Sequence, residues 1–388
     1  MSAETMELHH LSKLPPTAAG YYDLYVTSAV AEIRESFAVS LACLQIPTTE
    51  PYPGVYRCRC SVEQLTRLSI NWEKQFTAAE QSQIQCRLID DAHEPSIAQL
   101  MHATSLGSLK AWVDGQWLTS MLEDRRLVTF FQPIVNNANP TEVFAYECLL
   151  RGVDRVGGMV MPGRILNAAR ATGTMLQVDQ LAQLTAITTA QEINLNTSIF
   201  INFNPRFMDS PDYLKTTIDT IRKTNIDPSR FVFEVVESDE IVAIDRLISV
   251  LKYCRNAGCR VALDDLGAGY SSLHLMAIVK PDFVKLDMNL IRNVDQDIYK
   301  SCVAAKLLEL ANELDVSTVV EGVESLGEWR WAMDHGADYA QGYLFARPDA
   351  IPPKPTRPEG SGKDTGVGIA GLGSVLGANL DGLPAESF

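Results

Sequence analysis

Residues 231–265 read FVFEVVESDEIVAIDRLISVLKYCRNAGCRVALDD and decide the fold of this chain. The stretch begins with the apolar run Phe231–Val236 and ends with a second one, Arg260–Leu263, each as long as a typical buried strand. Between them, Ile241–Ala257 has the spacing of an amphipathic helix. The apolar face of this helix carries Ile244, Leu247, Ile248 and Leu251. Strands joined by a helix are expected to run parallel, with the helix covering the sheet.

The same alternation extends in both directions, from residue 128 to about 348. We expect strands at Val128–Val135, Glu142–Leu150, Ser198–Phe203, Phe231–Val236, Arg260–Leu263, Phe283–Leu286, Thr318–Val320 and Tyr339–Tyr343. Helical stretches such as Cys302–Leu314 separate them. About eight strands in roughly 220 residues is close to the size of a TIM-like (β/α)₈ barrel. An open doubly wound sheet is the competing α/β arrangement, but no glycine-rich dinucleotide motif opens a helix here.

We place the predicted barrel at 128–350. The segments that flank it differ from it in composition and in the pattern of apolar residues. Residues 1–115 hold periodic apolar stretches broken by turns, and we predict a small mixed α/β domain, for which sensory, dimerising and partner-binding roles are open alternatives. A linker helix is expected at 116–127. Residues 351–388 are rich in proline and then glycine, with few large apolar groups. Burial cannot offset the ordering entropy of such a segment, so we expect a disordered tail.

Several elements of the N-terminal domain can be predicted from local patterns. The periodicity favours helices at Tyr21–Leu44, Glu63–Leu68 and Ser96–Ser105. Gly54–Cys60 and Gln85–Ile89 are candidate strands.

Composition restricts the class of partner and the compartment. The formal net charge of -15 argues against binding DNA through a broad basic surface. No stretch of about 18 apolar residues predicts a membrane span. The eight cysteines are scattered, and the Cys58-x-Cys60 spacing favours buried thiols over a zinc site. The N-terminus has no basic start followed by an apolar run. We therefore expect a cytoplasmic protein with free thiols.

Acids and amides come at the ends of the apolar runs of the predicted strands, at positions that an apolar pattern does not require. They are Glu147, Asn202, Glu234, Asp264, Asp265, Glu321 and Gln341. Each of them taken alone could be a helix cap or a loop charge. In a parallel barrel, however, the carboxyl ends of the strands meet at one rim, where active sites form. Five acids there would repel one another without a cation, so we predict oxygen-ligated divalent ions. The adjacent pair Asp264-Asp265 suits two ions that share a bridging carboxylate, as in phosphodiester cleavage.

Eight motifs in order give these residues a family context. They are FFQPIV at 130–135, YECLLRG at 146–152, INFNP at 201–205, FEVVES at 233–238, DDLGAGYSSL at 264–273, VKLD at 284–287, VVEGVES at 319–325 and QGYLFARP at 341–348. Together they make the chain resemble the EAL-domain c-di-GMP phosphodiesterases over about 128–348. The resemblance implies hydrolysis of c-di-GMP to linear pGpG with two Mg²⁺ or Mn²⁺ ions. It also implies a homodimer formed through the barrel.

The resemblance implies specific roles for the matched residues. One ion would be held by Glu147, Asn202, Glu234 and Asp264. The other would be held by Asp264, Asp265 and Glu321. Lys285 would orient water and neutralise charge. Substrate would be bound by Gln132, Leu150, Arg151, Asp287, Gln341, Arg347 and Pro348. The ligands and the adjacent loop would be steadied by Glu237, Gly267, Gly269 and Glu324.

This chain departs from the family pattern at three places. The signature triplet reads Glu147-Cys148-Leu149, where alternation on a strand should turn Cys148 away from the metal side. In the loop, Leu266 replaces an aromatic residue and Ala268 replaces a hydroxyl-bearing one. These changes bear on loop rigidity and leave the ligand set intact.

Two further functional readings compete with catalysis. The first is a binding module that senses c-di-GMP without cleaving it. The second is a scaffold whose N-terminal domain binds a protein partner. Because every matched ligand is present, the sequence favours an active phosphodiesterase.

Overall fold

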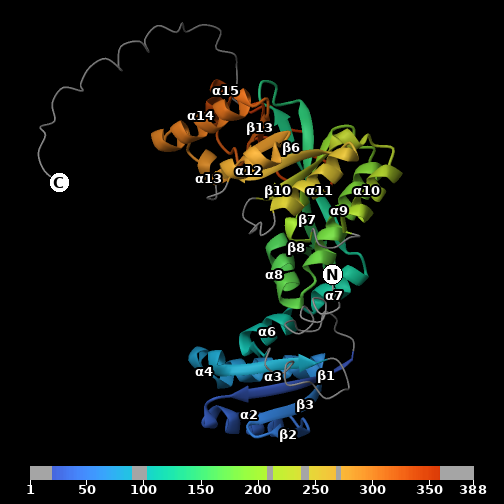
Figure 1. Cartoon of the computed structure of the whole chain (residues 1–388), viewed down its shortest axis with the longest axis vertical. Coiled ribbons are helices and arrows are strands. Elements are labelled where there is room, and N and C mark those ends of the chain that lie inside the picture. The colour runs from blue at the N-terminus through green and yellow to red at the C-terminus, as the bar shows by residue number, and fades with distance from the viewer. Residues whose placement is uncertain (1–19, 90–102, 208–212, 237–243, 268–271, 359–388) are drawn as a thin grey trace, which may run out of the picture.

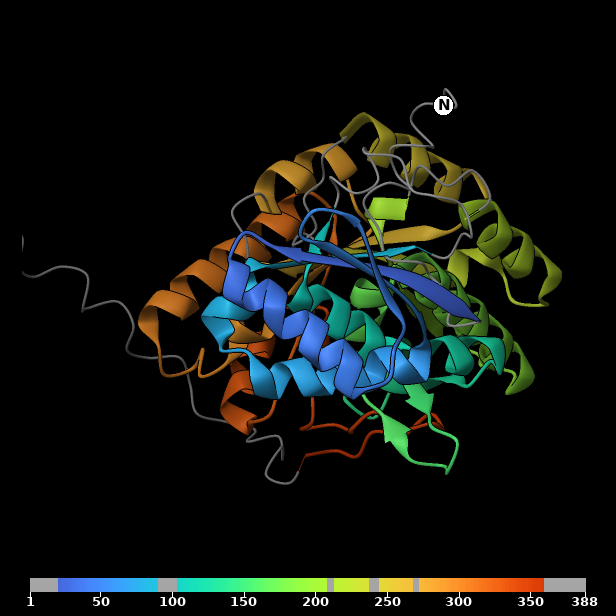
Figure 2. The ribbon, with the colours of Figure 1, turned by 90° about the horizontal axis from the view of Figure 1, so that it is seen from below.

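The computed structural model describes residues 20–89, 103–207, 213–236, 244–267 and 272–358. Figure 1 shows a small domain at the N-terminal, blue end and a larger barrel, with α6 between them. Figure 2 looks from the side of the small domain, whose blue strands and helices lie in front of the barrel. Among the described residues, no helix is both long and apolar enough to cross a membrane.

The described part of the N-terminal domain forms a five-stranded antiparallel sheet with strand order β2-β3-β1-β4-β5. Its elements in chain order are β1 (Tyr21–Ser28), α2 (Ala31–Cys43), β2 (Thr48–Tyr52), β3 (Val55–Ser61), α3 (Val62–Gln75), α4 (Ala78–Gln83), β4 (Ile84–Ile89), β5 (Thr104–Ser105) and α6 (Leu106–Gly115). One face of the sheet packs on the helices and buries Phe37, Trp72 and Trp112. The domain thus has a hydrophobic core of its own.

The prediction of one helix over Tyr21–Leu44 is wrong for its first third. Tyr21–Ser28 is the central strand β1, paired on both edges, and the helix begins only at Ala31. The segment YYDLYVTS is rich in aromatic and β-branched residues, which fit a pleated strand better than a helix. The periodic residues Ile33, Phe37 and Leu41 are buried on α2 as expected.

The other N-terminal predictions have different outcomes. The strands expected at Gly54–Cys60 and Gln85–Ile89 are β3 and β4, and the helix expected at Glu63–Leu68 lies within α3. Most of Ser96–Ser105 falls outside the described residues, and Thr104–Ser105 is a short strand instead of helix.

In the described part of the chain beyond α6, eight strands close into a barrel with order β6-β14-β13-β12-β11-β10-β9-β7, and β7 pairs back to β6. The strands are β6 (Leu127–Asn136), β7 (Val143–Val153), β9 (Ser198–Phe203), β10 (Phe231–Val236), β11 (Arg260–Leu266), β12 (Phe283–Leu286), β13 (Ser317–Val320) and β14 (Tyr339–Gln341). The short strand β8 (Met159–Val160) extends β7 as a hairpin. The helices around the barrel are α7 (Trp117–Glu123), α8 (Pro162–Thr172), α9 (Met175–Glu192), α10 (Tyr213–Lys223), α11 (Ile244–Asn256), α12 (Ser272–Val279), α13 (Met288–Ile291), α14 (Ile298–Glu313) and α15 (Leu326–Asp334). All eight predicted strands are present, and the TIM-like barrel is confirmed.

The barrel is mixed, so the expectation of uniformly parallel strands needs one correction. Strand β6 runs antiparallel to both of its neighbours, β7 and β14. Only residues 137–142 separate β6 from β7, and a parallel connection needs a crossover of a dozen or more residues. The remaining neighbouring pairs of the closed barrel run parallel.

An apolar layer fills the interior of the barrel at the depth where the strands begin. Its buried members contact one another although they come from seven different strands. They are Ile134, Ala145, Phe200, Val232, Ala262, Phe283 and Val319. The rings of Phe144 and Tyr339 stack at 3.9 Å beside this layer. The barrel is therefore a packed core with no open pore at this depth.

The small domain is joined to the barrel by close packing of α6 and α7 against α8. A Cβ atom on Gly115 would lie 2.8 Å from Thr172 Cγ2 and 3.2 Å from the Ala168 carbonyl oxygen. Leu118 and Met121 of α7 are buried in one apolar cluster with α8. Glycine at the end of α6 thus permits a helix contact that any side chain would obstruct.

Beyond the barrel, the first residues of the segment expected to be disordered lie against the fold. Asp349 pairs with Phe131 through two backbone hydrogen bonds. The Tyr146 hydroxyl donates to the Pro353 carbonyl oxygen at 3.0 Å, and Pro355 is buried. The expectation of disorder is therefore wrong for residues 351–358. Residues 359–388 lie outside the described part of the chain.

Candidate active site at the mouth of the barrel

A ring of polar side chains forms the next layer of inward-facing residues after the apolar layer, toward the mouth of the barrel. The alternation of side chains along a strand explains its position. Successive inward-facing residues on a strand are two positions apart. In every parallel strand the polar residue therefore comes two positions after the apolar one, and in β6, which runs the other way, two positions before it. The ring consists of Gln132, Glu147, Asn202, Glu234, Asp264, Lys285, Glu321 and Gln341.

Lys285 lies at the centre of this ring and contacts carboxylates from four strands. Its Nζ atom is 2.6 Å from Glu321 Oε1 and 2.7 Å from Glu234 Oε1. It is 3.2 Å from Asp264 Oδ1 and 3.4 Å from Glu147 Oε2. Burial by itself would lower the pKa of Lys285, but the four carboxylates outweigh it and raise this pKa well above its usual value. The ammonium is therefore a fixed positive charge.

Glu234 is the most deeply buried of these acids, at 0% exposure. Burial, and then the charges of Glu147 and Asp264, raise its pKa well above the usual value, although Lys285 opposes this. Among the described residues, no donor makes a hydrogen bond of good geometry to either Glu234 oxygen, even though Oε1 contacts the ammonium. A buried carboxylate oxygen without a hydrogen bond is costly, so this position favours a cation beside it.

A second group of acids lies at the end of β11 and the end of β13. Asp264, Asp265 and Glu321 each offer an oxygen, and these atoms lie within 4.8 Å of one another. Asp265 has a φ of 59°, the left-handed region, so its backbone adopts a conformation that is uncommon for a residue with a side chain. Burial, together with the charges of Asp264 and Asp287, raises the pKa of Asp265 to about 6.

Two amides hold Glu147 in place. Gln341 Nε2 donates to Glu147 Oε2 at 2.5 Å and to Gln132 Oε1 at 3.2 Å. Gln132 and Glu147 are also direct partners in the antiparallel pairing of β6 and β7. The amides therefore fix the rotamer of the acid that begins the signature triplet.

Asn202 is the last residue but one of β9 and the register partner of Glu234 in β10. Its side chain is exposed, and its backbone oxygen accepts a hydrogen bond from Gln183 at 3.2 Å. The strand pairing thus places Asn202 beside the deepest acid of the ring.

The donor set fits divalent metal ions. All candidate ligands offer oxygen, which Mg²⁺ and Mn²⁺ prefer. Four carboxylates surround one ammonium, so negative charge is in excess, and the Glu234 oxygens that accept no hydrogen bond lie within the same cluster. The residues present are therefore suited to hold cations.

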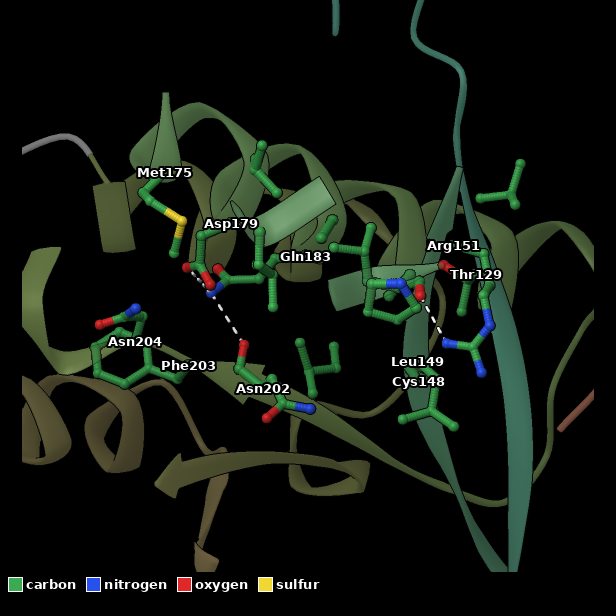
Figure 3. Close-up of a pocket in the computed structure, with 18 of the residues that line it drawn as sticks. Thr129, Cys148, Leu149, Arg151, Met175, Asp179, Gln183, Asn202, Phe203 and Asn204 are labelled. Carbon is green, nitrogen blue, oxygen red and sulfur yellow. Dashed lines mark hydrogen bonds between the residues drawn. The ribbon is translucent and has the colours of Figure 1, made fainter. Parts of the chain in front are cut away.

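A cleft of about 380 Å³ lies next to the ring, between β7 and β9 on one side and α8 and α9 on the other (Figure 3). Asn202 lines it, which connects the cleft to the ring. Arg151 lines it too, with Nη1 donating to the Leu150 carbonyl oxygen at 2.7 Å and the guanidinium 5.4 Å from the centre of the Phe130 ring. Burial lowers the pKa of Arg151, partly offset by Tyr343 and Glu147. The guanidinium remains charged.

Asp179 is the one acidic side chain among the described residues that line this cleft, and sequence reasoning missed it. It lies on α9 with Gln183 one turn later, and Gln183 Nε2 donates to Asp179 Oδ2 at 3.0 Å (Figure 3). Tyr213 of α10 also donates its hydroxyl hydrogen to Asp179. The sequence did carry a signal for this pair. Asp179 and Gln183 are polar, lie four positions apart, and share a helix face with the buried Ala186.

The remaining predicted residues have varied positions. Asp287 caps α13 by accepting from the Asn289 N–H at 2.8 Å, and its charge acts on Asp265. Glu324 accepts from half-buried Arg292 at 2.7 Å. The Arg347 guanidinium lies 4.3 Å from the centre of the Tyr343 ring.

The backbone at Gly267, with φ of 100°, uses the freedom expected of glycine there. Leu150 lines the cleft. Pro348 is half-buried. Glu237 and Gly269 lie outside the described residues.

Comparison with known proteins agrees with this geometry. Residues 116–348 match the EAL domain family, and the match begins at the segment that we had assigned to a linker helix. The probable cyclic di-GMP phosphodiesterase PdeG of Escherichia coli K12 is 27% identical over 237 residues, which cover 60% of this chain and 46% of PdeG. Matches to three other curated relatives cover 26–34% of their length, so this chain spans less than half of these relatives.

Two solved structures extend the comparison. The PaMucR phosphodiesterase in complex with c-di-GMP is 25% identical with a TM-score of 0.54, covering 60% of this chain and 95% of that one. A standalone EAL protein from Vibrio cholerae O395, in a form with bound c-di-GMP, is 28% identical with a TM-score of 0.52, covering 59% and 95%. Since the family match covers more than half of its residues, this chain belongs to the EAL domain family.

Proposed function

We propose that the protein hydrolyses c-di-GMP to linear pGpG and so lowers this second messenger in bacterial signalling. The observation that carries the proposal is the convergence of four carboxylates on Lys285 beside a cleft that presents Arg151. The relatives described as c-di-GMP phosphodiesterases or as complexes with c-di-GMP support the choice of substrate.

Two ions, Mg²⁺ or Mn²⁺, would be held by the oxygens of the ring and of the β11 end. The first would be bound by Glu147, Asn202, Glu234 and Asp264. The second would be bound by Asp264, Asp265 and Glu321. When bound, such ions supply a nucleophilic water at neutral pH and stabilise the charge that develops on the phosphate.

The protein's own side chains would bind and orient the substrate. Arg151 would donate two parallel hydrogen bonds to a phosphate, which suits its planar fork of donors. Lys285 would neutralise charge at the reacting phosphate, since its ammonium is fixed among the acids. Gln132 and Gln341 would keep Glu147 in the orientation needed to bind metal.

The cleft would hold one guanine. Asp179 would accept hydrogen bonds from the amino group of the base, which is a donor. Leu150 would line the nucleotide, and Asp287, Arg347 and Pro348 would border it on the opposite side. Glu237, Gly267, Gly269 and Glu324 remain predicted to steady the loop and ligands.

The direct test is chromatography of c-di-GMP incubated with the purified protein and Mg²⁺ or Mn²⁺. We expect pGpG to accumulate, chelator to stop the reaction, and added metal to restore it. Glu147→Gln should abolish turnover because it removes a charged ligand, whereas Glu142→Gln, at an exposed position just before the same strand, should not. Arg151→Ala should raise KM. Substantial turnover by the Glu147→Gln variant would contradict the metal assignment.

Binding of c-di-GMP without cleavage is the second candidate, and one observation favours keeping it. The cleft has its own charged groups, Arg151 and Asp179, which belong to different elements from most of the metal-binding acids. Intact c-di-GMP retained by the protein in the presence of Mn²⁺, with no pGpG formed, would establish this sensor function.

Self-association is also part of the proposal. Exposed apolar side chains line α14, with Ile298 at 78%, Tyr299 at 83% and Val303 at 52% exposure. These exposed apolar side chains support a homodimer through the barrel. We further propose that the N-terminal domain has a sensory or dimerising role and that the protein acts in the cytoplasm.

A further inference from the structure

The side chain of Gln183 is 1% exposed and lies between the cleft and the barrel. Its Nε2 atom is 3.0 Å from Asp179 Oδ2, 2.6 Å from the Tyr213 hydroxyl and 3.2 Å from the Asn202 carbonyl oxygen. Its Oε1 atom accepts from the Thr217 hydroxyl at 2.8 Å. One amide thus connects α9, α10 and the end of β9.

The number of hydrogens on the Gln183 amide limits how many of its three acceptors can receive a full hydrogen bond. An amide nitrogen carries two hydrogens, so it cannot donate fully to three acceptors at once. Tyr213 donates its own hydroxyl hydrogen to Asp179, and this leaves the hydroxyl oxygen free to accept from Gln183. The second amide hydrogen serves the Asn202 carbonyl, and the first is shared between the Tyr213 hydroxyl and Asp179 Oδ2. Asp179 is therefore held by Tyr213 directly and by Gln183 both directly and through Tyr213.

The direction of the amide is fixed by its acceptors. The Asp179 carboxylate and the Asn202 carbonyl oxygen can only accept, so the amide nitrogen of Gln183 faces them. The amide oxygen then accepts from the hydroxyl of Thr217, one turn beyond Tyr213 on α10. The ring of Tyr213 packs at 5.7 Å from Phe203 and 5.8 Å from Phe207. These contacts leave Asp179 little freedom to turn away from the cleft.

We propose that Gln183 is a positioning residue that fixes the Asp179 carboxylate for the guanine base and ties it to the strand end that carries Asn202. The inference rests on the proposed function, because it assigns a purpose to the cleft. Its physical consequence is that the base site and the metal-ligand strand form one rigid unit. A purely structural amide would satisfy buried groups without affecting recognition of a ligand.

The test is the dissociation constant of c-di-GMP, measured by calorimetry under two conditions. The first uses the protein in chelator. The second uses Mn²⁺ and a Glu147→Gln background, in which turnover should be abolished. We expect Gln183→Leu to weaken binding by about tenfold, the effect of losing one hydrogen bond to a charged group. Asp179→Ala should weaken it by a similar factor. The double variant should bind no more than about twofold more weakly than Asp179→Ala alone, because coupled residues are not additive.

The matched control is Gln177→Leu, the same change at an exposed position of the same helix, which should leave binding unchanged. If Gln183→Leu fails to fold, Tyr213→Phe replaces it. That change removes only the hydroxyl between Gln183 and Asp179 and keeps the ring packing, and we expect about threefold weaker binding.

The outcomes separate the two proposals. This inference alone would be overturned if the wild type binds c-di-GMP and Gln183→Leu binds it with the same dissociation constant. It would also be overturned if the effects of Gln183→Leu and Asp179→Ala on the dissociation constant are independent of each other. If neither the wild type in chelator nor the Glu147→Gln protein in Mn²⁺ binds c-di-GMP, the proposed function and this inference are overturned together. A KM that rises in Gln183→Leu while kcat changes little would support positioning over loss of fold.

Discussion

Lys285 shows how one residue stabilises the arrangement of acids that a metal site needs. Four carboxylates within 3.4 Å of its Nζ atom would repel one another in the barrel interior without it. A buried charge that loses its partner is strongly destabilising, so the ammonium keeps the acids together when no metal is bound.

We predict that Lys285→Met destabilises the protein in chelator by about 3–5 kcal/mol, the usual result of removing one partner of a buried ion pair. This corresponds to a fall in Tm on the order of 10 °C. Mn²⁺ should raise the Tm of the variant more than that of the wild type, because the cation replaces the missing charge.

The control for this prediction is Lys306→Met, which removes a lysine paired with Glu309 on the exposed surface. Its Tm should change little, since such surface pairs contribute up to about 1 kcal/mol. Equal Tm values for the wild type and Lys285→Met in chelator at pH 8 would contradict the assigned role.

Asp265 leads to a prediction about pH. Its pKa is about 6 in the fold, above the usual 3.8. The folded state therefore binds the proton more tightly than the unfolded chain, and ionisation between about pH 4 and 6 destabilises the fold. In chelator, Asp265→Asn should raise Tm relative to the wild type at pH 8 and have a smaller effect at pH 4. Asparagine tolerates the left-handed backbone, so a pH-independent difference would count against this explanation.

At the scale of the element, the strands explain why the polar ring is complete. Each inward position two residues beyond the apolar layer is an acid, an amide or a lysine, whichever strand carries it. Local pattern revealed most of these residues because they follow apolar runs. It did not reveal that Gln132 joins the same ring from a strand of opposite direction, because strand direction depends on pairing.

Helix α14 leads to a prediction about self-association. We expect Val303→Asp to weaken the proposed homodimer by about tenfold or more, because it places a charge in an apolar contact. Light scattering after size-exclusion chromatography over a range of concentrations measures this. Asn312→Asp, on an exposed position of the same helix, should leave the mass unchanged. A wild-type protein that stays monomeric at all concentrations would refute the dimer.

At the scale of the whole molecule, the contact between α6 and α8 joins the N-terminal domain to the barrel. Helix α8 also contributes Pro162, Leu166 and Arg170 to the lining of the cleft. A displacement of α6 would therefore move a helix that lines the cleft.

We predict that Gly115→Ala costs about 1–3 kcal/mol in unfolding free energy, because the new Cβ overpacks the contact with Thr172. Gly107→Ala on the same helix meets only Ser105 Oγ at 3.7 Å and should be neutral or stabilising by about 0.4–1 kcal/mol. Denaturant titration gives both values. Equal effects of the two variants would show that the junction is not tightly packed.

Only the tertiary structure brought the Asp179, Gln183 and Tyr213 network together. Tyr213 is 34 residues from Asp179 in sequence, and nothing in either local pattern announces the contact. A similar limit explains the error at Tyr21–Ser28. The predicted helix was extended into this segment, but its pairing with two neighbouring strands makes it a strand.

The sequence by itself determined the alternation of strands and helices, the eight strands and the acids at their ends, because hydrophobic period and chain order are local properties. The tertiary structure decided the antiparallel direction of β6, the placement of Lys285 among four acids, and the cleft beside them. These features depend on which distant segments become neighbours, and that is settled by packing, hydrogen bonding and charge in the folded chain.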